Sequence, residues 1–119
     1  MASHVDVGRI DDESCREFVD SVELVGKRWT AAIMLAAARG AQRFSELHHA
    51  VDGISARLLT VRLKELEDNE LIERTVIPTT PVQVRYELTP RGKELLAGLM
   101  PLIRWHRRWA TAGGKAEMS

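Results

Sequence analysis

The sequence predicts a single, mainly α-helical domain that carries one small β-hairpin. Its 119 residues are the length of one compact domain. Apolar residues recur at spacings of three and four over most of the chain, which is typical of helices that bury one face. Residues 72–88 alternate instead, and a short alternating stretch predicts paired strands.

The first two elements are expected to be helices on either side of Gly26. Within residues 13–25, Phe18 and Val22 fall on one helical face. Residues 28–39 form an alanine-rich run with high helix propensity, in which Trp29, Ile33 and Ala36 continue the helical spacing. The second helix is therefore expected to be well buried.

A short helix, a tight turn and a longer helix are expected next. Ser45 is predicted to cap a helix over residues 46–51, which Asp52-Gly53 ends with a turn. Ser55 is predicted to cap a helix that runs to about residue 69. The inward stripe of that helix consists of three leucines, Leu59, Leu63 and Leu66.

The last part of the chain predicts a hairpin followed by a long helix. Residues 72–77 pair with a strand in which Val84, Tyr86 and Leu88 share one face. The prolines of residues 78–81 suit a projecting tip because they cannot donate ladder hydrogen bonds. Thr89-Pro90 is a typical helix start.

These elements give the expected domain boundaries. Residues 1–12 are expected to form a flexible acidic N-terminus, residues 13–111 the domain, and residues 112–119 a frayed tail. Within the domain, the helix-turn-helix is expected at about 44–69, the hairpin at about 72–88 and the C-terminal helix at about 90–110.

This order of elements is that of a winged helix-turn-helix, whose second paired helix enters the DNA major groove. On a helical wheel, the side opposite the leucine stripe carries side chains suited to reading bases and phosphates, and two arginines flank the hairpin. The predicted partner is therefore double-stranded DNA. The predicted contacts are Ser45, Ser55, Ala56, Arg57, Thr60, Val61, Lys64, Arg74 and Arg85.

The charge distribution agrees with a local rather than a general DNA-binding surface. Seventeen Lys and Arg balance seventeen Asp and Glu, which excludes a uniformly basic coat. Within residues 24–66, however, seven basic residues face three acidic ones. This middle segment is the positive part of the chain.

Other function classes receive no support from the residue pattern. The histidines lack metal-ligand spacing, no nucleophile or phosphate-loop motif is present, and we expect no enzyme activity, no metal and no cofactor. No apolar stretch approaches the roughly 20 residues of a membrane span. A single cysteine fits a reducing compartment, so a cytoplasmic location is expected.

Five motifs in order give the chain a resemblance to a known family. They are Gly26-Lys27-Arg28-Trp29, Arg43-Phe44-Ser45-Glu46-Leu47, Gly53-Ile54-Ser55-Ala56-Arg57-Leu58-Leu59-Thr60, Leu63-Lys64-Glu65-Leu66-Glu67 and Tyr86-Glu87-Leu88-Thr89-Pro90-Arg91-Gly92. In these blocks the sequence resembles HxlR-type winged helix-turn-helix transcriptional regulators, relatives of the MarR group. The resemblance implies a bacterial homodimer that represses or activates transcription, with dimer contacts from the first and last helices.

The last helix carries an apolar belt wider than contact with one neighbour requires, and a partner subunit is the simplest cover. The expected dimerisation residues are Phe18, Val22, Leu99, Ile103, Trp105 and Trp109.

Cys15 has two interpretations. Some members of the family sense electrophiles or oxidants through an N-terminal cysteine, and Cys15 occupies a similar place, although Arg16 stands where the family usually has proline. Without a second cysteine, a disulfide would need Cys15 of the other subunit or a small-molecule thiol. The alternative is a small buried residue in line with Phe18 and Val22.

Two further functions stay open at this stage. The winged helix could hold a partner protein instead of DNA, although its reading face lacks large apolar anchors. Trp29, Trp105 and Trp109 could line a pocket for a small aromatic effector, although packing explains them more simply.

Overall fold

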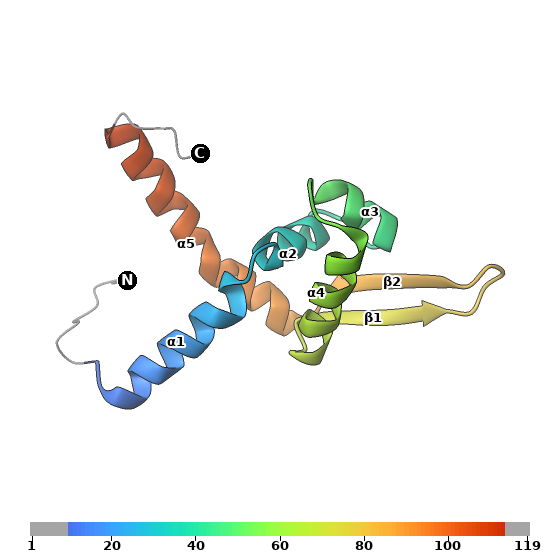
Figure 1. Ribbon diagram of the computed structural model, residues 1–119, viewed down its shortest axis with the longest axis horizontal. Coiled ribbons are helices and arrows are strands. Elements are labelled where there is room, and N and C mark those ends of the chain that lie inside the picture. The colour runs from blue at the N-terminus through green and yellow to red at the C-terminus, as the bar shows by residue number, and fades with distance from the viewer. Residues whose placement is uncertain (1–9, 114–119) are drawn as a thin grey trace.

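The computed structural model describes residues 10–113, which form five helices and one two-stranded sheet (Figure 1). The strands β1 (Ile72–Ile77) and β2 (Gln83–Leu88) are antiparallel. The helices are α1 (Asp12–Gly26), α2 (Thr30–Ala38), α3 (Phe44–Ala50), α4 (Ala56–Asp68) and α5 (Pro90–Gly113). A hairpin that follows the α3–α4 pair confirms the predicted winged helix-turn-helix fold.

The first two helices differ slightly from their predicted bounds. Asp11 caps α1 by accepting a hydrogen bond of 2.7 Å from the Ser14 amide, and this bond lowers the pKa of the Asp11 carboxyl. The predicted start of the second helix at residue 28 is wrong. Trp29 has a φ of 82°, and because this left-handed conformation cannot belong to a right-handed helix, α2 begins at Thr30.

The C-terminal helix starts as predicted and ends later. Thr89 caps α5: its hydroxyl accepts from the Gly92 amide at 2.9 Å and donates to the Glu70 carbonyl at 2.7 Å. The helix runs to Gly113, three residues beyond the predicted end at about 110, so it extends into the predicted frayed tail from 112. The rest of that tail, and residues 1–9 of the predicted N-terminus, lie outside the described residues.

The core is built around α2, which packs against each of the other four helices and β2. Leu59, Leu63 and Leu66 of α4 are buried in it, as predicted. The remaining buried apolar residues are Ile33, Met34, Ala36, Leu47, Val51, Ile54, Leu71, Ile72 and Leu88. The helix-turn-helix and the base of the hairpin therefore share one core.

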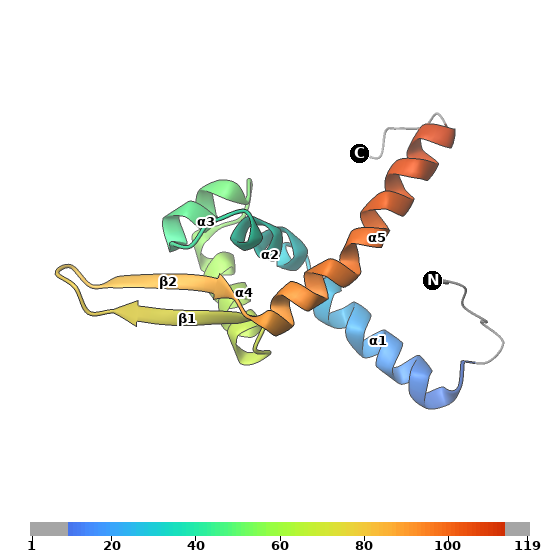
Figure 2. The ribbon, with the colours of Figure 1, turned by 180° about the vertical axis from the view of Figure 1, so that it is seen from behind.

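The hairpin is joined to the helices at its base and projects away from them (Figures 1 and 2). Its register pairs Ile72 with Leu88 and Val76 with Val84. The Tyr86 amide donates to the Gln42 carbonyl at 2.7 Å, so the segment between α2 and α3 lies beside β2 as a short third strand would. This bond holds the base of the hairpin, the wing of the winged helix-turn-helix, against the α3–α4 pair.

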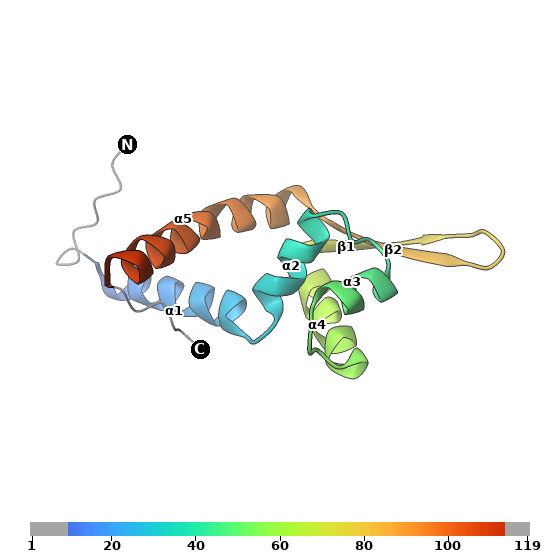
Figure 3. The ribbon, with the colours of Figure 1, turned by 90° about the horizontal axis from the view of Figure 1, so that it is seen from above.

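Helices α1 and α5 project as two arms on the side opposite the wing, which Figure 3 shows from above. Figure 1 shows the arms splaying apart from the body formed by α2–α4 and the sheet. No residue of α1 is buried within the described part of the chain. No helix among residues 10–113 is long and apolar enough to cross a membrane.

Candidate nucleic-acid interface

The start of α3, the first helix of the helix-turn-helix, is stabilised by the side chain of Glu46. The Glu46 carboxylate accepts hydrogen bonds from the backbone amides of Gln42 at 2.9 Å and Arg43 at 3.1 Å. These amides, with smaller contributions from the Arg43 and Arg85 charges, lower the pKa of Glu46. The prediction that Ser45 caps this helix is therefore wrong: Ser45 is the second helical residue, and its side chain is exposed.

The turn between α3 and α4 is fixed by three contacts. Gly53 has a φ of +95°, and a Cβ added there would lie 3.3 Å from Cη2 of Trp29. The His48 ring Nε2 donates to the Ile54 carbonyl at 3.0 Å. The Ser55 hydroxyl accepts from the Leu58 amide at 3.0 Å, which confirms Ser55 as the N-cap of α4.

The outward face of α4 carries the predicted reading residues together. Arg57, Thr60, Val61 and Lys64 are all exposed, opposite the buried leucine stripe. The Thr60 hydroxyl donates to the Ala56 carbonyl at 3.0 Å, which leaves its oxygen free as an acceptor. Together with Ser55 and Ala56 at its start, this face offers one guanidinium, one ammonium, two hydroxyls and three small apolar groups.

The two cations of this face differ in their partners. Lys64 Nζ lies 3.2 Å from a carboxylate oxygen of Asp68, so a phosphate would have to replace this exposed ion pair. Arg57 has no carboxylate within ion-pair distance among residues 10–113. Arg57 is therefore the cation of this face that is free to bind a base or a phosphate.

The two wing arginines do not lie together. Arg74 is paired with Tyr86 across the hairpin, whereas Arg85 is paired with Thr75, so the two guanidinium groups leave opposite faces of the ribbon. Arg74 is exposed. Arg85 is half-buried on the face toward α3, where its charge helps to lower the pKa of Glu46. A DNA strand that follows one face of the wing would meet only one of them.

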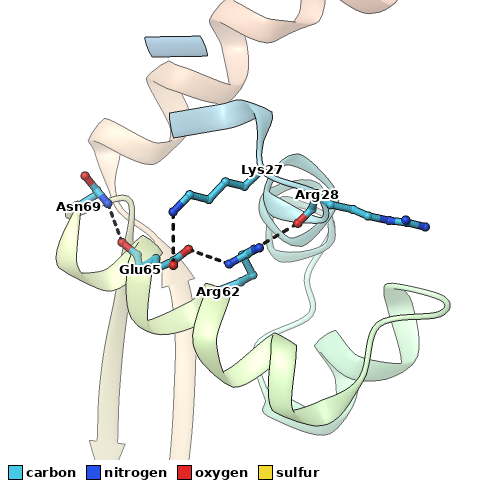
Figure 4. Close-up of polar contacts among 5 residues, drawn as sticks. All are labelled: Lys27, Arg28, Arg62, Glu65 and Asn69. Atoms are coloured by element: carbon cyan, nitrogen blue, oxygen red, sulfur yellow. Dashed lines mark hydrogen bonds and ion pairs between the residues drawn. The ribbon is translucent and has the colours of Figure 1, made fainter. Parts of the chain in front are cut away.

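A polar cluster that the sequence analysis missed joins the α1–α2 turn to α4 (Figure 4). The Glu65 carboxylate lies 3.4 Å from Lys27 Nζ and 3.2 Å from Arg62 Nη1. Arg62 Nε also donates to the Arg28 carbonyl at 3.3 Å, and Asn69 Nδ2 donates to the Glu65 carbonyl at 2.8 Å. The Arg62–Glu65 and Asn69–Glu65 contacts are local, at spacings of three and four residues, whereas no local spacing predicts the contacts of Lys27 and Arg28 with α4.

The predicted dimerisation residues lie on the two arms and are open to solvent. Phe18 is 66% exposed, Trp105 52% and Trp109 58%. Val22 is exposed as well, while Leu99 and Ile103 are half-buried. Single exposed apolar residues are common, but large ones in this number on the two arms are typical of an interaction surface.

Cys15 lies on α1 with its side chain exposed. In the isolated chain, the prediction of a buried packing residue is therefore wrong. Among residues 10–113, no group of three or more His, Cys, Asp or Glu side chains could hold a metal ion. A cavity of about 600 Å³ lies between α2, β2 and α5, but no tryptophan lines it, so it does not support the aromatic-effector alternative.

Comparisons with known proteins agree with this architecture. Residues 24–113 match the model of the HxlR-like helix-turn-helix family. The chain is 42% identical over 97 residues to the HTH-type transcriptional regulator YvaP of Bacillus subtilis, an alignment that covers 82% of this chain and 90% of YvaP. YodB, an HTH-type transcriptional regulator of the same organism, is 38% identical over 99 residues, covering 83% of this chain and 88% of YodB.

Solved structures show the same fold. Diamide-treated YodB superposes with a TM-score of 0.69 at 39% identity, covering 82% of this chain and 93% of YodB. Quinone-bound YodB superposes with a TM-score of 0.68 at 34% identity, covering 79% of this chain and 99% of YodB. A transcriptional regulator assigned to the MarR family, from Enterococcus faecalis V583, gives 0.77 at 28% identity, covering 96% of this chain and 99% of that protein.

Proposed function

The chain belongs to the HxlR-like helix-turn-helix family of transcriptional regulators, which are DNA-binding proteins and not enzymes, and from this premise we propose that it is a cytoplasmic homodimeric repressor of a pseudo-palindromic operator. The observation that carries the proposal is the outward face of α4, where Arg57, Thr60, Val61 and Lys64 are exposed together. A helix that presents such a face beside a projecting wing suits entry into the major groove.

Each residue of this face has a proposed role. Arg57 reads a guanine through two hydrogen bonds to its O6 and N7 atoms, and the methyl groups of Thr60 and Val61 contact a thymine methyl group. Ser55, Ala56 and Lys64 contact the phosphate backbone, with Lys64 exchanging Asp68 for a phosphate. Ser45 at the start of α3 and Arg74 on the wing add backbone or minor-groove contacts. Arg85 contributes less, because its side chain turns toward α3.

Dimerisation through the arms would set the distance between the two copies of α4, which we call the reading helix. The exposed apolar residues of α1 and α5 would be covered by the same residues of a second copy, as in an isologous two-fold interface. Two copies of α4 related in this way would enter successive major grooves about 34–36 Å apart. The operator is therefore expected to have two inverted half-sites.

Selection from genomic DNA tests the proposal. Reduced protein is incubated with fragmented genomic DNA of its source organism, and the fragments that stay bound at moderate salt are sequenced. Recovery of an inverted-repeat site upstream of genes supports the proposal. Recovery of no site, or equal recovery of all fragments, contradicts it. Transcription from a recovered promoter, with and without the protein, then distinguishes repression from activation.

Two variants test the reading face itself. Arg57→Ala is expected to lose about 1–3 kcal/mol of binding free energy at one operator position and to relax the preference there. Lys64→Ala is expected to weaken binding to all sequences about equally, with a salt dependence about one unit shallower for each subunit. Unchanged binding by Arg57→Ala would rule out this face.

A thiol switch at Cys15 is part of the same proposal. Support comes from the exposure of Cys15 and from the similarity of the chain to YodB, which has been solved in diamide-treated and quinone-bound forms. Diamide would take two hydrogens as the Cys15 thiols of two subunits form one disulfide, whereas a quinone would add to a single thiolate. Either change on α1 would respace the reading helices. Loss of operator binding after diamide in wild type but not in Cys15→Ser supports the switch, and an equal response refutes it.

A further inference from the structure

Arg28, which lies in the turn between α1 and α2, sits beside the flank of the reading helix (Figure 4). On α4, Arg62 and Glu65 lie between the buried stripe and the outward face, and both contact this turn. The turn therefore borders the outward face of α4 along one side. A helix in the major groove, which is about 12 Å wide, has a phosphate strand on each side.

The side chain of Arg28 is free to meet such a strand. In Figure 4 it points away from the cluster around Glu65. It is exposed, and no carboxylate among residues 10–113 lies within ion-pair distance of it. Its guanidinium carbon lies 4.8 Å from the centre of the Trp29 ring. Among residues 10–113 the guanidinium donates no hydrogen bond, so its N–H groups are open to bind a phosphate through two hydrogen bonds while the ring contact is kept.

The turn that carries Arg28 is held rigidly. Trp29 has a φ of 82°, a conformation that bulky residues adopt only where their surroundings impose it. The surroundings are the Trp29 ring against Gly53, the Thr30 amide donating to the Lys27 carbonyl at 3.1 Å, and the Arg28 carbonyl accepting from Arg62. Arg28 is thus fixed relative to both the turn of the helix-turn-helix and α4.

We propose that Arg28 binds a DNA backbone phosphate at the edge of the major groove that α4 enters, beside Trp29. The proposal rests on the proposed function, since it needs α4 to lie in the groove. The neighbouring Lys27 points instead into the cluster around Glu65, with its Nζ 3.4 Å from that carboxylate, whereas Arg28 points away from the cluster (Figure 4). Arg28 would therefore fix the depth and angle of the reading helix without reading bases itself.

The test measures binding of fluorescent operator DNA, recovered by the genomic selection, across a salt series. Arg28→Ala is expected to weaken binding to the operator and to unrelated DNA by the same factor, about tenfold, and to make the salt dependence about one unit shallower for each subunit. Arg39→Ala is the matched control, because it removes the same charge from an exposed residue at the other end of α2. It is expected to leave both quantities unchanged.

A second variant separates charge from packing. Arg28→Lys keeps the cation but not the planar, stacked group, so it should keep the salt dependence of wild type while losing part of the affinity. If Arg28→Ala binds with the affinity and salt dependence of Arg39→Ala, the Arg28 contact is refuted and the proposed function stands. If wild type binds no DNA, both fail. If Arg28→Ala does not fold, a wild-type affinity in Arg28→Lys refutes the stacked contact.

Discussion

The body and the two arms of this protein are built in opposite ways. In the body, α2–α4 and the base of the hairpin bury twelve apolar residues against one another, six of them with almost no exposed surface. In the arms, α1 has no fully buried residue and the far half of α5 exposes large apolar side chains. Helices α1, α4 and α5 are all amphipathic in sequence, but of these three only α4 buries its whole apolar stripe within the described chain.

The helical spacing of apolar residues therefore does not by itself show whether the apolar face of a helix is buried within its own chain or is left exposed for another molecule. The stability of the body comes from contacts within one chain and should not depend on protein concentration. Contacts between the arms of two copies would make their contribution depend on concentration. The following predictions use this contrast, beginning with the largest expected effect.

Truncation of the core should destabilise the body at every protein concentration. Leu59→Ala removes a fully buried side chain, and we expect the free energy of unfolding to fall by about 2–5 kcal/mol. Val61→Ala, on the outward side of the same helix, should change it by no more than about 0.5 kcal/mol. Urea denaturation measures both, and similar losses in the two variants would contradict the burial pattern of α4.

Truncation of an arm should act on association instead. Trp105→Ala is expected to weaken self-association by about 2 kcal/mol, or roughly 30-fold, because large aromatic side chains dominate such interfaces. Sedimentation equilibrium over a concentration series measures the change, with Arg107→Ala on the same helix as control. A wild-type protein that stays monomeric at all concentrations would remove the dimer from the proposal.

The junction between body and arm should tolerate no side chain at Gly92. A Cβ there would lie 2.2 Å from the Leu71 carbonyl oxygen, whose position is fixed by the Thr89 amide. Gly92→Ala should therefore cost about 1–3 kcal/mol of stability. Gly98→Ala, in the same helix with nothing within 4 Å, should instead stabilise by about 0.5–1 kcal/mol. Equal signs in thermal denaturation of the two variants would contradict this close approach.

The smallest effect concerns pH and the start of α3. Because the pKa of Glu46 is lowered in the folded protein, its ionised form stabilises the fold above the ordinary pKa of 4.5, and this stabilisation is lost as the pH falls through the lowered value. Glu46→Gln cannot titrate. The difference in urea midpoint between wild type and Glu46→Gln should therefore be constant above about pH 5 and shrink in acid. A difference that does not change with pH would contradict the assignment.

Most of the fold was predictable because its signals are local. The leucine spacing of α4, the Ser55 cap and Thr89-Pro90 each act within one turn of helix, and the structure confirms all three. Ser45 was a misleading signal of the same kind. A serine before a glutamate resembles a cap, but Glu46 itself reaches back to the amides of Gln42 and Arg43.

The details that depend on tertiary structure were not predictable. Whether Arg74 and Arg85 share a face depends on the register of the hairpin, and composition of the tip does not determine that register. The left-handed conformation of Trp29 depends on where its ring meets Gly53 in the folded chain. For this reason no local pattern distinguishes Arg28 from the other arginines of the sequence, although Arg28 belongs to one of the five motifs that carry the family resemblance.

The close fit of Gly92 against Leu71 lies near the start of α5, so a rotation of α5 about this contact moves the far end of the helix most. The helix ends at Gly113, so its far end lies about 32 Å from Gly92 at a rise of about 1.5 Å per residue. A swing of about 10° at Gly92 carries the far end through about 5.5 Å, which is more than one base-pair step of DNA. In the proposed dimer, a small angular change at this one glycine would therefore become a much larger change in the distance between the two subunits.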